Sequence, residues 1–376
     1  MLEITARIAS AALLASALAC HADQIEYSAY HVGDNYDNTV ATTSFSLAKT
    51  LWQRTMIMLD VQLDQTTAPP LEDGVSGASR PARHSKSEFR KNRGQIIGGL
   101  EQGLGDDTKI MASYYFSQET DYQSQSFMGG ITQSLAEKNF TITLRGQYIL
   151  DSVGEILADG SIVNRFKETH GLSLILTQLL SPTTSLRVGA DAMRNHGFLS
   201  DPYSKVPTPL AIIVTIKDDT ITETHPSMRY RQAAWAEIGQ YLRGLDASIT
   251  FSYRYYWDDW GVLANSGALQ INKYITPDWV FSPEYRYYEQ TAADFGEYTE
   301  GADGYFQAVD TKLTEFSSNT VGATVTCFLR TFSRNHPTWD FLNNSSLAVT
   351  YLRYFTDTAP KNYTSDIWQG SLKFTF

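Results

Sequence analysis

Strict alternation of apolar and polar residues over a membrane-length segment constrains this chain more than any other feature. Between Leu245 and Asp258, every second residue belongs to one chemical class. The apolar face carries Leu245, Ala247, Ile249, Phe251, Tyr253, Tyr255 and Trp257, and the polar face carries Asp246, Ser248, Thr250, Ser252, Arg254, Tyr256 and Asp258. A period of two indicates a β-strand with two different faces. Soluble strands usually span about five or six residues, so this longer segment, which ends in aromatics, is typical of a strand that crosses a bilayer.

The same alternation recurs along the chain, for example over 57–64, 140–148 and 320–329. Counting such segments gives about sixteen strands. Their starts lie near residues 23, 40, 54, 93, 107, 122, 139, 168, 183, 227, 245, 259, 277, 317, 342 and 366. The pattern therefore predicts an all-β fold, a transmembrane antiparallel up-and-down β-barrel.

The connections between these segments alternate in length, as they do in bacterial outer-membrane barrels. Tight turns are predicted near residues 52, 105, 137, 182, 244 and 276, and long loops at about 65–92, 150–167, 195–226 and 291–316. The short turns would face the periplasm and the long loops the outside.

The first 22 residues resemble an export signal. Arg7 precedes an apolar stretch from Ile8 to Ala19, and small residues follow at a suitable cleavage point. This divides the chain into a signal peptide, 1–22, and a barrel, 23–376, in the outer membrane of a Gram-negative type of envelope. Cys20 leaves lipidation open as an alternative to its removal.

The composition excludes several other classes of protein. Charged residues make up 19% of the chain, below the globular average of about 25%, and the formal net charge of −11 argues against a nucleic-acid partner. Beyond the signal no run of 18 apolar residues is present, so a spanning helix is not expected and a membrane protein must be a closed barrel. Cys327 lies on an apolar strand face and is interpreted as a small hydrophobic residue.

The last segment of the chain ends in a phenylalanine with apolar residues at alternate positions behind it. This face carries Trp368, Leu372, Phe374 and Phe376. Such an ending is similar to the signal that the barrel assembly machinery reads, which makes that machinery an expected partner. The alternative is an amphipathic final strand of a soluble β protein.

Five groups of residues, in this order, are similar to the exported barrel family called "domain of unknown function 3570". They are Ser76-Gly77-Ala78-Ser79; Ser117, Glu119, Asp121, Tyr122 and Ser124; Gly197-Phe198-Leu199-Ser200 with Pro202-Tyr203; Tyr253-Arg254-Tyr255-Tyr256 with Asp258-Asp259-Trp260-Gly261; and Arg286-Tyr287-Tyr288 with Gln290, Ala292, Ala293, Asp294 and Phe295. The resemblance implies an outer-membrane barrel and no defined reaction. Gly296 stands where the family pattern has Tyr. The family's association with exported redox proteins implies a possible redox partner in the envelope.

Strand parity places a set of charged residues on the lumen face. They are Arg145, Arg187, Asp191, Arg229, Arg231, Asp246, Arg254, Glu284 and Arg286. Two interpretations stay open: pairing across the lumen, or an arginine-lined path for anions. A barrel of about sixteen strands is roughly 30 Å across, so water or folded-in loops must fill it. A hairpin built from Leu210–Ile216 and Thr220–Thr224 could plug the lumen or extend the wall outward.

A functional cluster is predicted at the outer mouth, where several inward-facing residues reach a similar height. Its candidates are Glu119, Asp121, Arg254, Tyr256, Asp258, Arg286, Tyr288 and Gln290. Arg254 and Arg286 would share acidic partners. Glu119 and Asp121 would join them only if loops fold inward, and the alternative is an aromatic girdle with ordinary ion pairs.

A basic cluster in the loop before residue 93 would lie near lipopolysaccharide phosphates, although a solvated loop is the alternative. It contains Arg83, His84, Lys86, Arg90 and Lys91.

Enzyme chemistry has little support. None of His31, His84, His170, His196, His225 and His336 has the spacing of metal ligands, and neither a nucleophile elbow nor a phosphate loop is present. No cofactor or metal is expected. Three classes remain: a porin-like channel for small polar or anionic solutes, a scaffold for an envelope partner that is possibly a redox protein, and, with least support, an outer-membrane enzyme.

Overall fold

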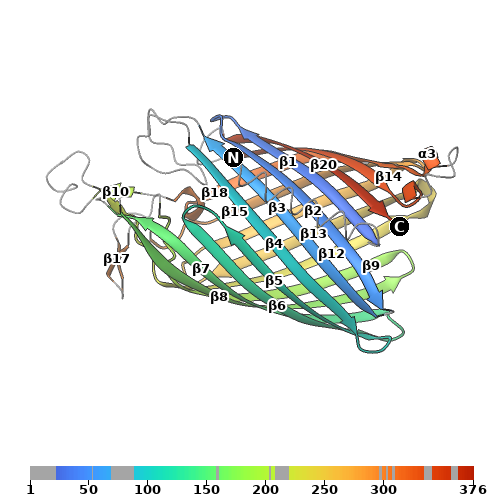
Figure 1. Cartoon of the computed structure of the whole chain (residues 1–376), viewed down its shortest axis with the longest axis horizontal. Coiled ribbons are helices and arrows are strands. Elements are labelled where there is room, and N and C mark those ends of the chain that lie inside the picture. The colour runs from blue at the N-terminus through green and yellow to red at the C-terminus, as the bar shows by residue number, and fades with distance from the viewer. Residues whose placement is uncertain are drawn as a thin grey trace.

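The protein is a closed antiparallel β-barrel of sixteen strands (Figure 1). The computed structural model describes residues 23–52, 54–68, 89–157, 161–202, 205–207, 220–295, 299–301, 304–306, 310–333, 341–356 and 363–376. The barrel strands are β1 (Gln24–Asp34), β2 (Thr39–Trp52), β3 (Thr55–Ala68), β4 (Phe89–Gly103), β5 (Thr108–Gln118), β6 (Tyr122–Leu135), β7 (Phe140–Ile156), β8 (Ile162–Ser181), β9 (Thr184–Gly197), β12 (Met228–Leu242), β13 (Ala247–Asp258), β14 (Leu263–Thr276), β15 (Trp279–Gln290), β18 (Phe316–Phe328), β19 (Ser346–Thr356) and β20 (Thr364–Thr375). The predicted number of strands and their order are confirmed.

The period-two pattern sets which side chains face lipid. Phe251 of β13 lies opposite Ile238 of β12 and Leu269 of β14, and all three are exposed on the outer surface of the barrel. Its neighbour Ser252 lies opposite Glu237 on the inner face. Because the side-chain period is two, this register keeps the apolar set outside and the polar set inside along the whole strand.

Aromatic residues bound the apolar outer surface at both ends. Tyr253, Tyr255 and Tyr287 lie toward one end, and Tyr241 and Trp279 toward the other. Such girdles are found where transmembrane barrels meet the two membrane–water interfaces.

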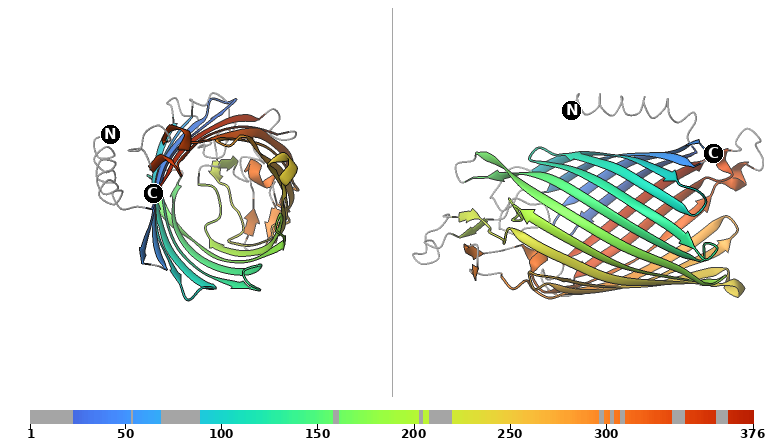
Figure 2. Two further views of the ribbon diagram at one scale, coloured as in Figure 1. Left: turned by 90° about the vertical axis from the view of Figure 1, so that its right-hand side faces the viewer. Right: turned by 90° about the horizontal axis from the view of Figure 1, so that it is seen from below.

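The two ends of the barrel differ in the length of their connections (Figures 1 and 2). The tight turns gather at the end that holds the C-terminus, including a 3₁₀ turn, η1 (Arg243–Leu245), and the turn at Ala136–Lys138, whose three residues all have positive φ. The short helix α3 (Arg330–Ser333) lies at this end too. Under the proposed orientation this end faces the periplasm.

The other end carries the longer connections and two small sheets. One pairs β10 (Lys205–Pro207) with β11 (Thr220–Thr222), and the other pairs β16 (Thr299–Gly301) with β17 (Gly304–Phe306). Thr220–Thr222 thus forms a hairpin with Lys205–Pro207, whereas the expected partner, Leu210–Ile216, lies outside the described residues.

The prediction of a long loop at about 150–167 is wrong. β7 continues to Ile156 and β8 already begins at Ile162, with unbroken pairing from Phe140↔Gln178 to Ile156↔Ile162. These two strands form a hairpin that projects beyond the neighbouring strands. Its polar side chains pair across the hairpin, Arg165 with Glu155 at 2.7 Å and Lys167 with Asp151 at 3.0 Å, so the strands continue here without strict apolar alternation.

The barrel closes between its first and last strands. β1 pairs with β20 from Gln24↔Thr375 to Asp34↔Ser365, and the backbone N–H of Phe376 donates to the carbonyl of Asp23 at 3.0 Å. The outward face of this seam carries Trp368, Leu372, Phe374 and Phe376. Phe341 stacks on both Phe374 and Phe376, so the last strand is held at the turn end by aromatic contacts.

Cys327 is a free cysteine on the apolar face of β18, opposite Trp279 and Leu347. This agrees with its interpretation as a small packing residue. In the part of the chain that the structure describes, no helix is long and apolar enough to cross a membrane.

Candidate functional site

The lumen wall carries the predicted charges on its inner face. The structure places Arg145, Arg187, Asp191, Arg229, Arg231 and Glu284 there, along one continuous register from β7 to β15. Asp246, also expected inside, instead sits in the tight turn after η1 with a left-handed backbone. Strand parity cannot be extended into a turn, where the backbone no longer alternates.

Several of these charges form ion pairs along the wall. Arg187 of β9 contacts Glu237 of β12 at 3.0 Å and also lies over the ring of Trp235. Glu284 accepts from the side chain of Gln270 at 3.5 Å. Glu237 was not among the predicted lumen charges, although it has the same parity on β12 as Arg229 and Arg231 and the alternation could have found it.

The predicted mouth cluster is divided among three strand groups. In the first, Lys91 of β4 contacts both Glu119 and Asp121 beside β5 and β6, and its amino group lies 2.9 Å from Asp121. All three side chains are largely buried. Lys91 therefore points into the lumen. The expectation that it belongs to the basic outer loop is wrong. Arg83, His84 and Lys86 lie outside the described residues.

Asp258 is the centre of the second group, on β13. Its carboxylate accepts from Arg229 Nε at 2.9 Å and from the Tyr256 hydroxyl at 2.5 Å. It also accepts the backbone N–H groups of Trp260 and Val262, each at 3.0 Å. The Asp258 side chain is fully buried, so one carboxylate fixes the inner wall, the tight turn and a neighbouring strand together.

Arg286, Tyr288 and Gln290 form the third group, on β15. The Arg286 guanidinium lies over the Tyr288 ring, whose hydroxyl donates to Gln290 at 2.8 Å. The Gln290 amide donates to the carbonyls of Lys312 and Thr314, both at 2.8 Å, next to the 3₁₀ turn η2 (Thr311–Leu313).

Arg254 pairs away from Arg286, so the expectation that they share acidic partners is wrong. Arg254 reaches Asp191 of β9 at 2.8 Å. On the intervening strand β12, Trp235 lies directly opposite Arg254 and the buried Ala233 lies directly opposite Asp191, so the ion pair crosses β12 diagonally.

Loops fold inward at this mouth and pack around an aromatic core. Trp260, Phe295 and Leu313 are buried against one another, with Leu199 beside them. The Trp260 ring also stacks under Arg229 at 4.3 Å, and its indole N–H donates to the Met228 carbonyl at 2.8 Å. Glu119 and Asp121 were expected to approach the opposite wall only if loops fold inward, and such inward-folded loops are present.

A buried pair of side chains supports the inward-folded segment after β9. His225 Nε2 lies 3.0 Å from a carboxylate oxygen of Glu223, and His225 Nδ1 lies 3.1 Å from the Leu199 carbonyl. The His225 ring packs against Trp260 and Phe295. Sequence reasoning missed this pair because Glu223 and His225 belong to no strand of the barrel and carry no spacing motif.

Gly261 is required by this packing. It has a positive φ of 82°, and a Cβ there would lie 2.2 Å from the Asp294 carboxylate. The turn after β13 can therefore approach the segment after β15 only with glycine at this position.

The family-like segments meet at this mouth. Leu199, Trp260 and Phe295 come from three of the five sequence groups and contact one core. Asp121 of a fourth group shares a cavity of about 270 Å³ with Arg229 and Trp260. The fifth group, Ser76–Ser79, and Gly296 lie outside the described residues.

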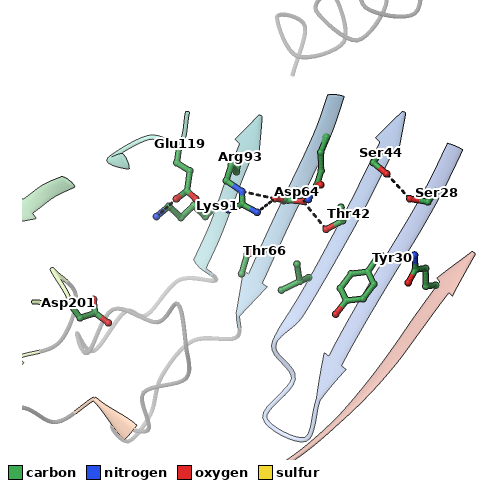
Figure 3. Close-up of a pocket in the computed structure, with 13 residues that line it drawn as sticks. Ser28, Tyr30, Thr42, Ser44, Asp64, Thr66, Lys91, Arg93, Glu119 and Asp201 are labelled. Carbon is green, nitrogen blue, oxygen red and sulfur yellow. Dashed lines mark hydrogen bonds and ion pairs between the residues drawn. The ribbon is translucent and has the colours of Figure 1, made fainter. Parts of the chain in front are cut away.

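A larger cavity of about 620 Å³ lies against the inner wall from β1 to the end of β5, where Glu119 follows that strand, and Gln369 of β20 also lines it (Figure 3). Its lining is mostly hydroxyl, amide and charged side chains from strand residues, and Asp201 contributes from the inward-folded segment after β9. Ser28, Tyr30, Thr42 and Asp64 are among the residues that Figure 3 shows around it.

Among the described residues no group of three His, Cys, Asp or Glu side chains is placed to hold a metal ion. The polar lining can bind and orient a solute, and this is the chemistry that the geometry offers.

The sequence matches the family described as "Protein of unknown function (DUF3570)" over residues 5–163 and 157–336. No curated protein matches it. Among solved structures, the chain is similar to the siderophore receptor PirA from Acinetobacter baumannii, with 10% identity and a TM-score of 0.46 over 89% of this chain and 52% of that one. The chain thus spans about half the length of that receptor.

Two shorter proteins give comparable similarity. OccK2 (OpdF) from Pseudomonas aeruginosa has 9% identity and a TM-score of 0.47, with 94% of this chain and 97% of that chain covered. The CymD monoaromatic hydrocarbon channel has 9% identity and a TM-score of 0.46, with 94% and 88% covered.

Proposed function

This chain belongs to the family described as DUF3570, and we propose that it is an outer-membrane barrel through whose lumen small polar or anionic solutes cross the membrane. In this proposal the turn end faces the periplasm, the loop end faces outward, and lipids and lipopolysaccharide surround the wall. The barrel assembly machinery would insert it by recognising β20.

One observation carries the proposal: the two faces of the wall suit two different solvents. The outer face exposes large apolar residues such as Phe251, Leu269 and Val325. The inner face carries ion pairs, amides and hydroxyls around cavities of about 620 and 270 Å³. A lumen too wide to be filled by side chains alone, with this lining, favours the passage of hydrated solutes.

The inward-folded loops narrow this passage at the outer mouth. The core of Trp260, Phe295 and Leu313 lies against the wall near Arg229 and takes up part of its cross-section. A narrowed mouth favours small solutes over large ones, because each solute must pass the lining groups at contact distance.

The test is single-channel conductance of the purified barrel in a planar bilayer. We expect discrete, stable current steps. Replacing Arg254 and Arg286 together with Gln should lower the preference for anions and change the step size, because both guanidinium groups face the lumen. Arg353→Gln is the matched control, since Arg353 lies on the outer face of β19.

A barrel that inserts correctly and passes no current would overturn the transport proposal. The scaffold alternative would then stand. It would be supported by co-purification of a periplasmic protein, such as a redox-active one.

A further inference from the structure

The charged side chains that line the cavity against β1 to β5 are paired with one another. Asp64 accepts from Thr42 and from Gln62, each at 2.8 Å, and from Arg93 Nε at 2.6 Å. Its side chain is only 8% exposed. Each oxygen of this carboxylate therefore has donors within the wall, and the Arg93 charge is neutralised where it lies (Figure 3).

The second cation of this cavity is neutralised in the same way. Lys91 contacts Glu119 and Asp121, and the exposed fractions of the Lys91 and Glu119 side chains are 16% and 15%. An ionic solute entering this cavity would have to compete with partners already in contact. Because the carboxylates of Asp64, Glu119 and Asp201 outnumber the two cations, the lining gives little advantage to an anionic solute over a neutral one.

Groups that both donate and accept hydrogen bonds make up the remaining polar lining. Within the described part of the chain, Tyr30, Thr66 and Gln369 make no side-chain hydrogen bond, and all three line the cavity. Ser28 and Ser44 bond to each other at 2.6 Å and retain further capacity. Hydroxyls and carboxamides of this kind match a solute whose own polar groups are hydroxyls.

The shape of the cavity also suits such a solute. Its volume of about 620 Å³ falls within the range of roughly 300–1,000 Å³ for small-molecule sites. The Tyr30 ring adds an apolar surface for the C–H groups of a sugar ring. Asp201, from the segment that folds inward after β9, also lines the cavity and bounds it at one side of the strands, making it a recess (Figure 3).

We propose that this recess is a binding site for neutral, polyhydroxylated solutes of the carbohydrate class, which pass along the β1–β5 wall. This inference rests on the proposed transport function and specifies its solute. The opposite wall, where β13 and β15 carry Arg254 and Arg286, does not take part in this binding.

The test measures binding and passage separately, with maltose as the neutral probe and maltobionate, its carboxylate counterpart of similar size, as the charged probe. Isothermal titration calorimetry of the purified barrel should show maltose binding, with maltobionate at least about tenfold weaker. In planar bilayers, maltose should interrupt the ionic current in a concentration-dependent manner.

Variants locate the site. Tyr30→Phe and Gln369→Ala each remove hydrogen-bonding groups and should weaken maltose binding by about 2–10-fold, the effect of one lost hydrogen bond. Ser252→Ala removes a lumen hydroxyl from the opposite wall and should leave binding unchanged. Heat-modifiable gel mobility identifies the folded variants, and Thr66→Ala replaces any variant that does not fold.

The outcomes separate this inference from the proposed function. A conducting barrel that fails to bind maltose, binds maltobionate equally well, or keeps full affinity in the wall variants overturns the carbohydrate assignment and leaves transport standing. Maltose binding that depends on Tyr30 and Gln369 in a barrel without conductance supports the binding site and overturns transport.

Discussion

Phe251 and Ser252 are neighbours in the chain, yet their side chains meet different solvents. Phe251 is half exposed on the outer face among Ile238 and Leu269, whereas Ser252 faces the lumen opposite Glu237. Phe251→Arg should destabilise the inserted barrel by roughly 2–4 kcal/mol, because it places a cation against lipid near the midplane. Ser252→Arg should cost far less. Urea unfolding in lipid vesicles measures both, and equal losses would contradict the assigned faces.

The carboxylate of Asp258 supports a second prediction at this scale. Asp258→Ala leaves the largely buried Arg229 guanidinium without its partner and frees the N–H groups of Trp260 and Val262. Removing one member of a buried pair costs about 3–5 kcal/mol, so the unfolding midpoint should fall clearly. Asp259→Ala is the control, since the exposed Asp259 accepts a single N–H, from Tyr230 at 2.8 Å. A loss as large for Asp259 as for Asp258 would show that the Asp258 contacts are not specific.

Sequence parity could predict the direction of a side chain but not its partner. It correctly aimed Arg254, Asp191 and Asp258 into the lumen. The ion pair between Arg254 and Asp191 crosses the intervening strand diagonally, and such cross-strand detail requires the register. The Glu223–His225 pair lies in an inward-folded segment with no periodicity, so no pattern could have found it.

At the scale of elements, strand positions followed closely from alternation and turn residues. The largest displacement is at β8, which was expected near residue 168 and begins at Ile162. Lipid imposes the period of two only over the membrane-spanning part of a strand. Where β7 and β8 project beyond it, polar residues interrupt the alternation and pair across the hairpin, so the boundaries of these strands could not be predicted.

The turn after β13 provides a prediction for an element. Gly261→Ala should displace the segment that carries Asp294 and Phe295 from Trp260, because the added Cβ would overlap the Asp294 carboxylate. The outer mouth should then become more sensitive to limited proteolysis on intact cells. Gly267→Ala, whose Cβ would make only an ordinary contact at 3.9 Å, should leave the cleavage pattern unchanged. Identical patterns for both variants would refute the close approach at Gly261.

The last strand of the barrel provides a further prediction. Deleting Phe376 should reduce insertion while export continues, because the terminal aromatic completes the outward face of β20 and its N–H closes the seam with Asp23. Surface yield measured against the periplasmic pool tests this. Phe341→Ala, which removes only the stacking partner, should insert nearly normally. Normal surface yield of the deletion would refute a role for this residue in assembly.

For the whole molecule, the closed barrel was predictable because a membrane protein without spanning helices has only this way to satisfy its backbone hydrogen bonds. The inward-folded loops and the recess beside β1 to β5 could not be predicted, because both depend on segments that meet only after the barrel closes. The paired charges of that recess and the arginines of the opposite wall line two sides of one lumen.

Site-directed labelling along β13 tests most directly whether the polar face borders water and the apolar face borders lipid. In a mature barrel with Cys327→Ser, single cysteines would replace Phe251, Ser252, Tyr253 and Arg254, and a charged maleimide would be added to the inserted protein. We predict rapid labelling of Ser252→Cys and Arg254→Cys, and protection of Phe251→Cys and Tyr253→Cys. Uniform labelling, or labelling of the odd positions alone, would contradict a water-filled lumen enclosed by a lipid-facing wall.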